Sequence, residues 1–364
     1  MTNPDDFGIY IHIPFCSTRC DYCAFTTFTK YGHLQKRYID ACIKEIDLTR
    51  KDGLFRTPTS VYLGGGTPSL IDGDDLTRLI KHLGVLPDTE ITVECNPESF
   101  SEDLCALLKE AGVNRISLGV QSMVPKVLKD LGRPHYPGAV ENSLGLINKY
   151  GFPTHSVDII YGTNAETPED LLKTLDTIFE IDKGLPHLSA YALTPEQGTP
   201  LARDSKRHPN EDRQATYYEI IDEYLHHRQM TWYEISNWAR DGHQCRHNRL
   251  YWDQKPYLAI GCGAHGYIDS VRYWNASSLT KYIETIESGT LARAGSETLT
   301  KEQSELEFLF LKLRTDEGIP QDCLDFSKEL DNLVVPTGSR YVLTRNGRLL
   351  ANEVAHRLKV PSGA

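Results

Sequence analysis

Short runs of β-branched and aromatic residues alternate with helical patterns from residue 7 onward, and this alternation limits the fold more than any other feature. The runs predict strands at 7–13, 60–63, 91–94, 115–119, 154–160 and 187–192. Strands that alternate with helices are typical of βαβ units around a parallel sheet. About six such units before residue 200 predict a partial or full (β/α) barrel. The expected fold class is therefore α/β.

Helices are expected between these strands, at 31–50, 138–149 and 169–181, and two further apolar faces lie near residues 76–83 and 104–111. In 169–181, Leu171, Leu175 and Ile178 recur at helical spacing. In parallel α/β folds the carboxyl ends of the strands meet at one edge and carry the chemistry. We therefore expect the functional site among the residues that end or follow these strands, which include Glu94, Gln121, Asp158 and Ala192.

The pattern changes twice in the second half of the chain. After about residue 200 the alternation loosens, and from Leu299 a separate pattern begins with a helix, GIP, LTRNGRLL and a last helix. The Asn346-Gly347 step predicts a turn, in a small wing hairpin. We expect a core barrel in 1–200, a segment that completes it in 201–298, and a small winged-helix-like α+β domain in 299–364.

Three cysteines on one predicted loop, Cys16, Cys20 and Cys23, have the spacing C-x3-C-x2-C. Thiolates select iron–sulfur clusters, zinc or copper(I). A structural zinc site normally has four protein ligands, whereas a cubane cluster with three cysteines leaves one iron open. S-adenosylmethionine can chelate that iron through its amino and carboxylate groups. The spacing predicts a 4Fe-4S cluster with this cosubstrate.

Two plainer interpretations of the triplet remain open. His12 or His33 could complete a zinc site, which would make the chain a zinc-stabilised structural or interaction protein. Alternatively, the three cysteines could pack as small hydrophobic residues. The other cysteines Cys42, Cys95, Cys105, Cys262 and Cys323 are interpreted as structural.

Composition excludes several classes of protein. The chain has 364 residues and a formal net charge of -11, which argues against general binding to nucleic acid or anionic membranes. Nine scattered cysteines with no signal peptide in front of them favour reduced thiols over a disulfide framework. No apolar run approaches the ~18 residues of a membrane span. We expect a cytoplasmic protein.

A glycine run and several polar residues add to the expected site. Gly64, Gly65 and Gly66 lead into Thr67 directly after a strand, where the missing Cβ atoms allow a ligand close to the backbone. Glu94 could bind a ribose or an ammonium group. Single residues of this kind are common as helix caps, but four at successive strand ends beside a cluster loop indicate a site; the ring comprises Glu94, Gln121, Arg133 and Asp158.

These motifs in this order resemble a known family over nearly the whole chain. YIHIPFC, the cysteine triplet, GGGTPS, ECNPES, GVQS, DIIYG and AYALTPEQGTPLA are similar to the radical-SAM coproporphyrinogen dehydrogenase group, the oxygen-independent coproporphyrinogen III oxidase-like family. The resemblance implies a 4Fe-4S cluster on Cys16, Cys20 and Cys23. It also implies an S-adenosylmethionine site at Tyr10, Tyr22, Gly65, Gly66, Thr67, Glu94, Gln121, Arg133, Asp158 and Ala192.

Two features separate this chain from the dehydrogenase branch of that family. The branch has a further cysteine where this chain has Phe25, and it carries a longer leader before the cluster. The chain instead has an HNxxYW box, which resembles the HemW-type heme chaperones. Imidazole is a common axial ligand of heme iron, and aromatic rings pack on the macrocycle. The box implies heme binding at His247, Asn248, Tyr251 and Trp252, with Cys245 as an alternative or second ligand.

A glycine pattern at 261–266 is set aside. It satisfies G-x-G-x-x-G, but a dinucleotide fold requires a helix after it, and YIDSVRYW favours a strand. Nicotinamide binding is therefore not expected.

The first functional hypothesis is a heme chaperone that binds the cluster and S-adenosylmethionine and delivers heme to membrane hemoproteins. An electron donor would be needed if the cluster is reduced, which would allow cleavage to a 5′-deoxyadenosyl radical. The second hypothesis is an oxygen-independent coproporphyrinogen III dehydrogenase, an enzyme of porphyrin metabolism. No nucleic-acid partner is expected, the C-terminal domain is interpreted as a lid or docking surface, and a homodimer stays open.

Overall fold

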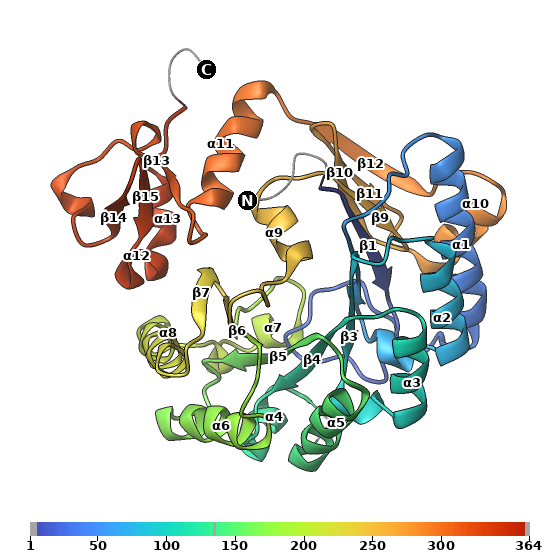
Figure 1. Ribbon diagram of the computed structural model, residues 1–364, viewed down its shortest axis with the longest axis horizontal. Helices are drawn as coiled ribbons and strands as arrows, with labels where there is room; N and C mark the ends of the chain where they lie inside the picture. Colours follow the sequence, from blue (N-terminus) through green and yellow to red (C-terminus); the bar gives the residue numbers. More distant parts are fainter. Residues whose placement is uncertain (1–5, 134–135, 361–364) are drawn as a thin grey trace.

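The computed structural model describes residues 6–133 and 136–360, and its main feature is one curved sheet (Figure 1). Among the described residues the sheet has 12 strands in the order β12-β11-β10-β9-β1-β2-β3-β4-β5-β6-β8-β7. The strands from β1 to β6 and β9 are parallel, and the others are antiparallel. Within the described part of the chain β12 and β7 do not pair, so the sheet forms a partial barrel and not a closed one. The expected α/β partial barrel is confirmed.

The strands of this sheet are short and follow the sequence pattern closely. Their bounds are β1 Gly8–Ile13, β2 Ser60–Gly65, β3 Glu90–Cys95, β4 Arg115–Gln121, β5 Thr154–Tyr161, β6 His187–Ala192, β7 Thr231–Glu234, β8 Asn237–Ala239, β9 Tyr257–Ile260, β10 His265–Ile268, β11 Val271–Asn275 and β12 Arg293–Thr298. Each of the six predicted strands is present within about two residues of its expected limits. The glycine pattern at 261–266 leads into strand β10, so the element that a dinucleotide site requires is not there.

Most helices that alternate with the strands cover the convex face of the sheet, whereas the helix Arg246–Trp252 lies inside its arc (Figure 1). Their bounds are α1 Gln35–Lys51, α2 Gly73–His82, α3 Glu102–Glu110, α4 Pro125–Asp130, α5 Pro137–Tyr150, α6 Pro168–Ile181, α7 Pro200–Arg203, α8 Glu211–His226, α9 Arg246–Trp252 and α10 Leu279–Glu287. Local signals start several of them. In α6, Pro168 follows Thr167, whose side chain forms a capping box with Asp170.

Alternation along the strands separates an apolar face from a polar one. On β1 and β2, Ile9, Ile11, Val61 and Leu63 are fully buried in the main core beneath the helices. Residues between them face the concave side, because successive strand residues point to opposite faces. Burial of each aliphatic side chain contributes roughly 1.5–3 kcal/mol, so the outer face holds the sheet in register. The inner face is left free for polar groups such as Tyr62 and Glu94.

A second, smaller unit follows β12. It contains α11 Lys301–Lys312, α12 Arg345–Leu349, α13 Ala351–Ala355 and a three-stranded antiparallel sheet in the order β13-β15-β14, with bounds Ile319–Pro320, Arg340–Leu343 and Val334–Thr337. Its core is separate and includes Leu313, Ile319 and Val354. Arg348 on α12 donates to Asp222 on α8 at 2.8 and 2.9 Å, which joins the unit to the barrel. The domain limits given from the sequence stay a prediction.

The predicted turn at Asn346-Gly347 is wrong. Both residues lie in α12, because the Thr344 side chain accepts a hydrogen bond from the Gly347 N–H at 3.0 Å and caps this helix. Glycine is needed at 347 because a Cβ there would lie 1.8 Å from the carbonyl oxygen of Leu333. The hairpin turn of this unit instead contains Gly338, between β14 and β15, with φ of 59°.

Over the described residues, none of the helices has the length and apolar character that crossing a membrane requires.

Candidate functional site

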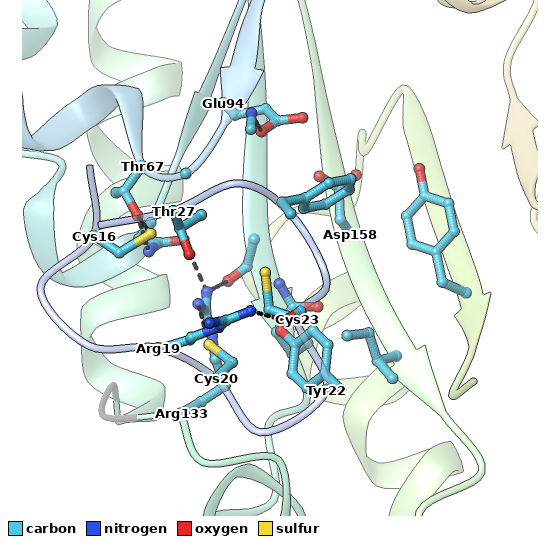
Figure 2. A pocket seen from close by; sticks show the side chains of 18 of the residues that line it. Cys16, Arg19, Cys20, Tyr22, Cys23, Thr27, Thr67, Glu94, Arg133 and Asp158 are labelled. Atoms are coloured by element: carbon cyan, nitrogen blue, oxygen red, sulfur yellow. Dashed lines mark hydrogen bonds between the residues drawn. The ribbon is translucent and has the colours of Figure 1, made fainter. Parts of the chain in front are cut away.

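A cavity of about 700 Å³ lies at the carboxyl ends of the parallel strands. Its walls come from the cysteine loop after β1 and from the ends of β2 to β6 (Figure 2). This volume falls in the range of small-molecule and cofactor sites. The position agrees with the rule that sites in parallel α/β folds lie at this edge of the sheet.

The three cysteines of the triplet all line this cavity and lie on one loop (Figure 2). None is in a disulfide: Cys20 is buried, and Cys16 and Cys23 are partly exposed. A backbone hydrogen bond of 3.2 Å from Cys23 to Cys20 closes a turn within the loop. Burial raises the pKa of the Cys16 and Cys23 thiols, so a cationic ligand would be needed to hold them as thiolates at neutral pH.

The glycine run fixes the base of the cysteine loop. The N–H groups of Gly66 and Thr67 donate to the carbonyls of Ile13 and Phe15, each at 2.8 Å. A Cβ on Gly66 would lie 2.6 Å from the Ile13 carbonyl oxygen, so only glycine allows this approach. The glycines therefore make room for protein backbone as well as for any ligand.

A chain of hydrogen bonds connects two of the cysteines. Thr67 Oγ1 donates to Cys16 Sγ at 3.7 Å and accepts from Asn96 Nδ2 at 3.1 Å. Asn96 Oδ1 accepts from Arg133 Nη2 at 2.8 Å, and Arg133 Nη1 donates to Cys20 Sγ at 3.4 Å. Donors aimed at sulfur stabilise a thiolate and tune the potential of an iron–sulfur cluster.

The donor set fits an iron–sulfur cluster with an external ligand. Three thiols outside any disulfide face one cavity, and the buried Nε of Arg133 has no hydrogen-bond partner among the residues that the structure describes. Within 6–133 and 136–360, no three His, Cys, Asp or Glu side chains are grouped closely enough to hold a single metal ion. A cubane places each thiolate on a different iron, so its ligands stand farther apart than those of one ion.

The zinc alternative gains nothing from the two histidines. His12 is buried, and its ring nitrogens are hydrogen-bonded to Tyr10 Oη at 3.0 Å and to the carbonyl of Thr26 at 2.8 Å. His33 is exposed and is not part of the cavity wall.

Glu94 is held in the cavity by two donors. Its carboxylate accepts from the Gly65 N–H at 3.0 Å and from Tyr62 Oη at 2.8 Å. A Cβ on Gly64 would lie 2.8 Å from the carboxyl carbon, so this glycine gives Glu94 its space. Burial, together with the charge of Asp158, raises the pKa of Glu94 to about 7, while the two hydrogen bonds oppose that rise.

Asp158 and Gln121 complete the polar wall. Asp158 accepts from Ser117 Oγ at 2.6 Å and from Ser156 Oγ at 3.0 Å, and burial raises its pKa. Gln121 has φ of 62° beside a bulge in β4, a conformation that costs energy for a residue with a side chain. Backbone strain of this kind is typical of functional sites.

The structure brings together every predicted cosubstrate residue except Tyr10. The cavity wall includes Tyr22, Gly65, Gly66, Thr67, Glu94, Gln121, Arg133, Asp158 and Ala192. Tyr10 lies below it on β1, with its hydroxyl on His12. The ligand role of all these residues stays a prediction.

Sequence reasoning missed several residues of the wall. Tyr62, Ser117 and Tyr191 face the cavity from the concave face, and Asn96 follows β3. The available signal was the period of two along each strand, since Tyr62 and Ser117 occupy the same alternating positions as the predicted residues. Phe25, where the dehydrogenase branch has cysteine, is 64% exposed at the cavity.

The four predicted heme residues do not reach this cavity. They lie on α9, inside the arc of the sheet (Figure 1), where α9 packs against the amino end of β2. His247 is fully buried, and its nitrogens are hydrogen-bonded to Ser60 Oγ and Tyr251 Oη, both at 2.8 Å. Asn248 and Trp252 are partly buried on the same helix. In this conformation His247 offers no nitrogen to a heme iron.

Cys245, the alternative heme ligand, is also enclosed. It is 2% exposed, and its thiol donates to Glu90 Oε1 at 3.7 Å. Glu90 accepts from the N–H groups of Arg246 and His247 at 3.2 and 3.0 Å, so it caps the amino end of α9. We call this end of the barrel, where α9 packs against the amino ends of β2 and β3, the floor.

Comparison with known proteins gives consistent matches. The model of the Radical SAM superfamily matches residues 10–178. The heme chaperone HemW of Mycobacterium tuberculosis is 39% identical over 370 residues, which cover 97% of this chain and 94% of that protein. HemW of Bacillus subtilis is 33% identical and covers 95% and 97% of the two chains.

Among solved structures, coproporphyrinogen III oxidase (HemN) from Escherichia coli, a radical SAM enzyme, superposes with a TM-score of 0.82. The match covers 96% of this chain and 89% of that protein at 21% sequence identity. At this identity the similarity establishes the fold.

Proposed function

Because this chain belongs to the HemW heme-chaperone family of radical SAM proteins, we propose that it binds a 4Fe-4S cluster, S-adenosylmethionine and heme, and delivers heme to membrane hemoproteins. We place this activity in the cytoplasm. The proposed heme delivery is based on the names of the relatives. The proposed binding of the cluster and the cosubstrate is also supported by the residues of this chain.

One observation supports the cluster and cosubstrate most directly. Three free cysteines and the partly buried charged groups Glu94, Arg133 and Asp158 line one cavity of about 700 Å³. The cosubstrate carries an ammonium, a carboxylate and a sulfonium, and it therefore needs partners of both signs. A cation at the cysteine end and two carboxylates opposite it meet this requirement.

Each residue has a defined task in this proposal. Cys16, Cys20 and Cys23 would hold three irons, and a bound cluster would supply the electron for reductive chemistry on the sulfonium. Arg133 would neutralise the cosubstrate carboxylate while its Nη1 remains on Cys20. Glu94 and Asp158 would accept hydrogen bonds from the amino group or the ribose of the cosubstrate. Gly65 would let these groups come close to the backbone.

Heme binding and delivery are proposed from the relatives of this chain. The relatives are named heme chaperones, and the chain is similar to them over most of its length. An electron donor would be required if the cluster is reduced during delivery.

The experiment is anaerobic reconstitution of the full chain with iron and sulfide, followed by titration with S-adenosylmethionine and, separately, with heme. We expect about four irons and four sulfides per chain, a change in the electron paramagnetic resonance spectrum on cosubstrate addition, and a Soret band with heme. A protein that binds zinc but no cluster, or a cluster spectrum indifferent to the cosubstrate, would refute the cluster assignment. Absence of a Soret shift would refute the heme assignment.

The dehydrogenase hypothesis is tested in the same preparation. Phe25 stands at the cavity where that branch has a cysteine, and we expect no conversion of coproporphyrinogen III to protoporphyrinogen IX. Turnover by the reduced protein would contradict the chaperone assignment.

A further inference from the structure

We propose that the HNxxYW box supports the cosubstrate pocket from behind its wall: His247 packs against Tyr62, which lines the pocket, and Tyr62 orients Glu94. His247 and Tyr62 are then positioning residues for the cosubstrate, and His247 is not the heme ligand. This inference rests on the proposed function, because it assigns S-adenosylmethionine to the cavity that contains Glu94.

Tyr62 contacts both Glu94 in the cavity and His247 on α9. Its hydroxyl donates to Glu94 Oε1 at 2.8 Å, and its ring stacks on the imidazole of His247, with centroids 5.3 Å apart and planes inclined by 27°. Tyr62 lies on β2 with Ser60, and both side chains face the concave side because they are two residues apart. One strand thus carries a contact to the cavity and a contact to the floor.

The imidazole of His247 is held on its edges as well as on its face. One nitrogen is bonded to Ser60, the other to Tyr251, and the Tyr251 ring packs edge-on with centroids 5.0 Å apart. Burial lowers the pKa of His247 to about 3, so the ring is neutral and each nitrogen has one hydrogen-bond role. Both roles are already filled by protein groups.

The helix that carries His247 is itself anchored. Glu90 caps its amino end, and Arg249 on the same helix donates to Asp316 at 2.7 Å. A Cβ on Gly8 would lie 2.7 Å from Leu250 Cδ1 and 3.1 Å from His247 Cε1, so α9 packs against the backbone of β1. The ring therefore sits on a rigid support beneath Tyr62.

A heme ligand would need a different environment. Axial ligation requires a nitrogen lone pair that faces a space wide enough for the macrocycle. His247 is fully buried and has no unbonded nitrogen. Rotation of the ring toward a ligand would break two hydrogen bonds and remove the support under Tyr62.

The consequence concerns the orientation of Glu94. One of its oxygens is fixed by the Gly65 backbone, and the other is fixed only by Tyr62 among the partners described above. Titratable groups that interact with it are Tyr10, Tyr62, Asp158 and Tyr191 on the neighbouring strands and Tyr251 on α9. Loss of the Tyr62 hydroxyl would leave Asp158 unopposed on that side and would raise the pKa of Glu94 further.

The test measures S-adenosylmethionine and heme affinity for reconstituted wild type, Tyr62→Phe and His247→Ala. Tyr217→Phe is the matched control, because Tyr217 is buried in α8 and its hydroxyl donates to the backbone of Glu166. We expect about tenfold weaker cosubstrate binding in Tyr62→Phe, the usual effect of a lost hydrogen bond to a carboxylate. In this variant the midpoint of the pH dependence of cosubstrate affinity should move to higher pH, because the pKa of Glu94 rises. A general loss of packing would not produce this change.

For His247→Ala we expect a similar loss of cosubstrate affinity with an unchanged Soret band on heme addition. Loss of the Soret band with unchanged cosubstrate affinity would overturn the inference. Should His247→Ala fail to fold, Tyr62→Phe removes a single oxygen and decides the question alone: wild-type affinity and pH profile would refute it. Failure of wild type to bind the cosubstrate would refute the proposed function instead.

Discussion

The two ends of strand β3 show how one sheet produces an open site and a closed floor. Glu90 and Glu94 lie on the same face of this strand, four residues apart. Glu90 is buried, and both of its carboxylate oxygens accept hydrogen bonds from N–H groups of α9. Glu94 instead faces a cavity beside three free cysteines. The same side chain is thus structural at the amino end and available for a ligand at the carboxyl end, which shows that position in the sheet, more than residue type, assigns function here.

The cavity end should depend on its thiols and not on its packing. We expect Cys20→Ala to abolish cluster assembly, with iron content near background after anaerobic reconstitution, because two thiolates hold a cubane poorly. Cys105→Ala, which changes a buried cysteine of the main core, should retain full iron. Equal iron in both variants would show that the triplet is not the cluster site.

The floor should depend on Glu90 for stability. Glu90→Ala leaves the N–H groups of Arg246 and His247 and the Cys245 thiol without their acceptor, and we expect a loss of about 3 kcal/mol in the free energy of unfolding. Urea unfolding measures it. Glu102→Ala, whose partner Lys149 is exposed, should change the value by less than about 0.5 kcal/mol. Similar values for both would mean that the floor is not held by its cap.

Glu94 should give the cavity end a pH dependence. Its pKa of about 7 in the folded protein exceeds the ordinary value of 4.5, so the folded state keeps a proton that the unfolded chain has lost. The resulting stability is fully present below about pH 4.5 and is lost as the pH rises through about 7. Without cluster and cosubstrate, we expect wild type to lose about 2 kcal/mol more than Glu94→Gln between about pH 5 and 8. Parallel pH curves for the two proteins would contradict this.

The smallest effect is expected at Asn96, which only relays between cavity groups. Asn96→Ala breaks the link from Thr67 to Arg133, and we expect iron to pass to a chelator about threefold faster, without loss of assembly. Asn148→Ala on the exposed face of α5 is the control. An unchanged rate would show that Arg133 and Thr67 hold their cysteines independently.

The sequence could predict the barrel because apolar periodicity is a local signal. The strand at 187–192 agrees with its predicted limits, and Glu94 and Gln121 lie at the ends of β3 and β4 as expected. Asp158 was expected at a strand end but lies inside β5, from where it faces the cavity. Tyr62 was missed although alternation along β2 assigns it to one face of the strand, because the register with β1 and β3 is needed to show that this face is the inner one. The HNxxYW box shows the opposite limit, since a histidine beside tyrosines has the same spacing whether it meets a ligand or packs in a floor.

The turn at Asn346-Gly347 failed for a similar reason. Asn-Gly favours a hairpin locally, but Thr344 three residues before the glycine also favours a helix start, and contact with the Leu333 backbone decides between them. Competing local signals are resolved by tertiary contacts that a single sequence does not display.

The backbone contact between the glycine run and the cysteine loop has a mechanical consequence. The backbones of Ile13 and Phe15 are hydrogen-bonded directly to those of Gly66 and Thr67, so we expect the two loops to move as one unit. A ligand that displaces Gly65 is therefore expected to shift the backbone next to Cys16 as well. We then expect occupancy of the pocket and the electronic state of a cluster bound at Cys16 to change together, even when a probe reports on only one of them.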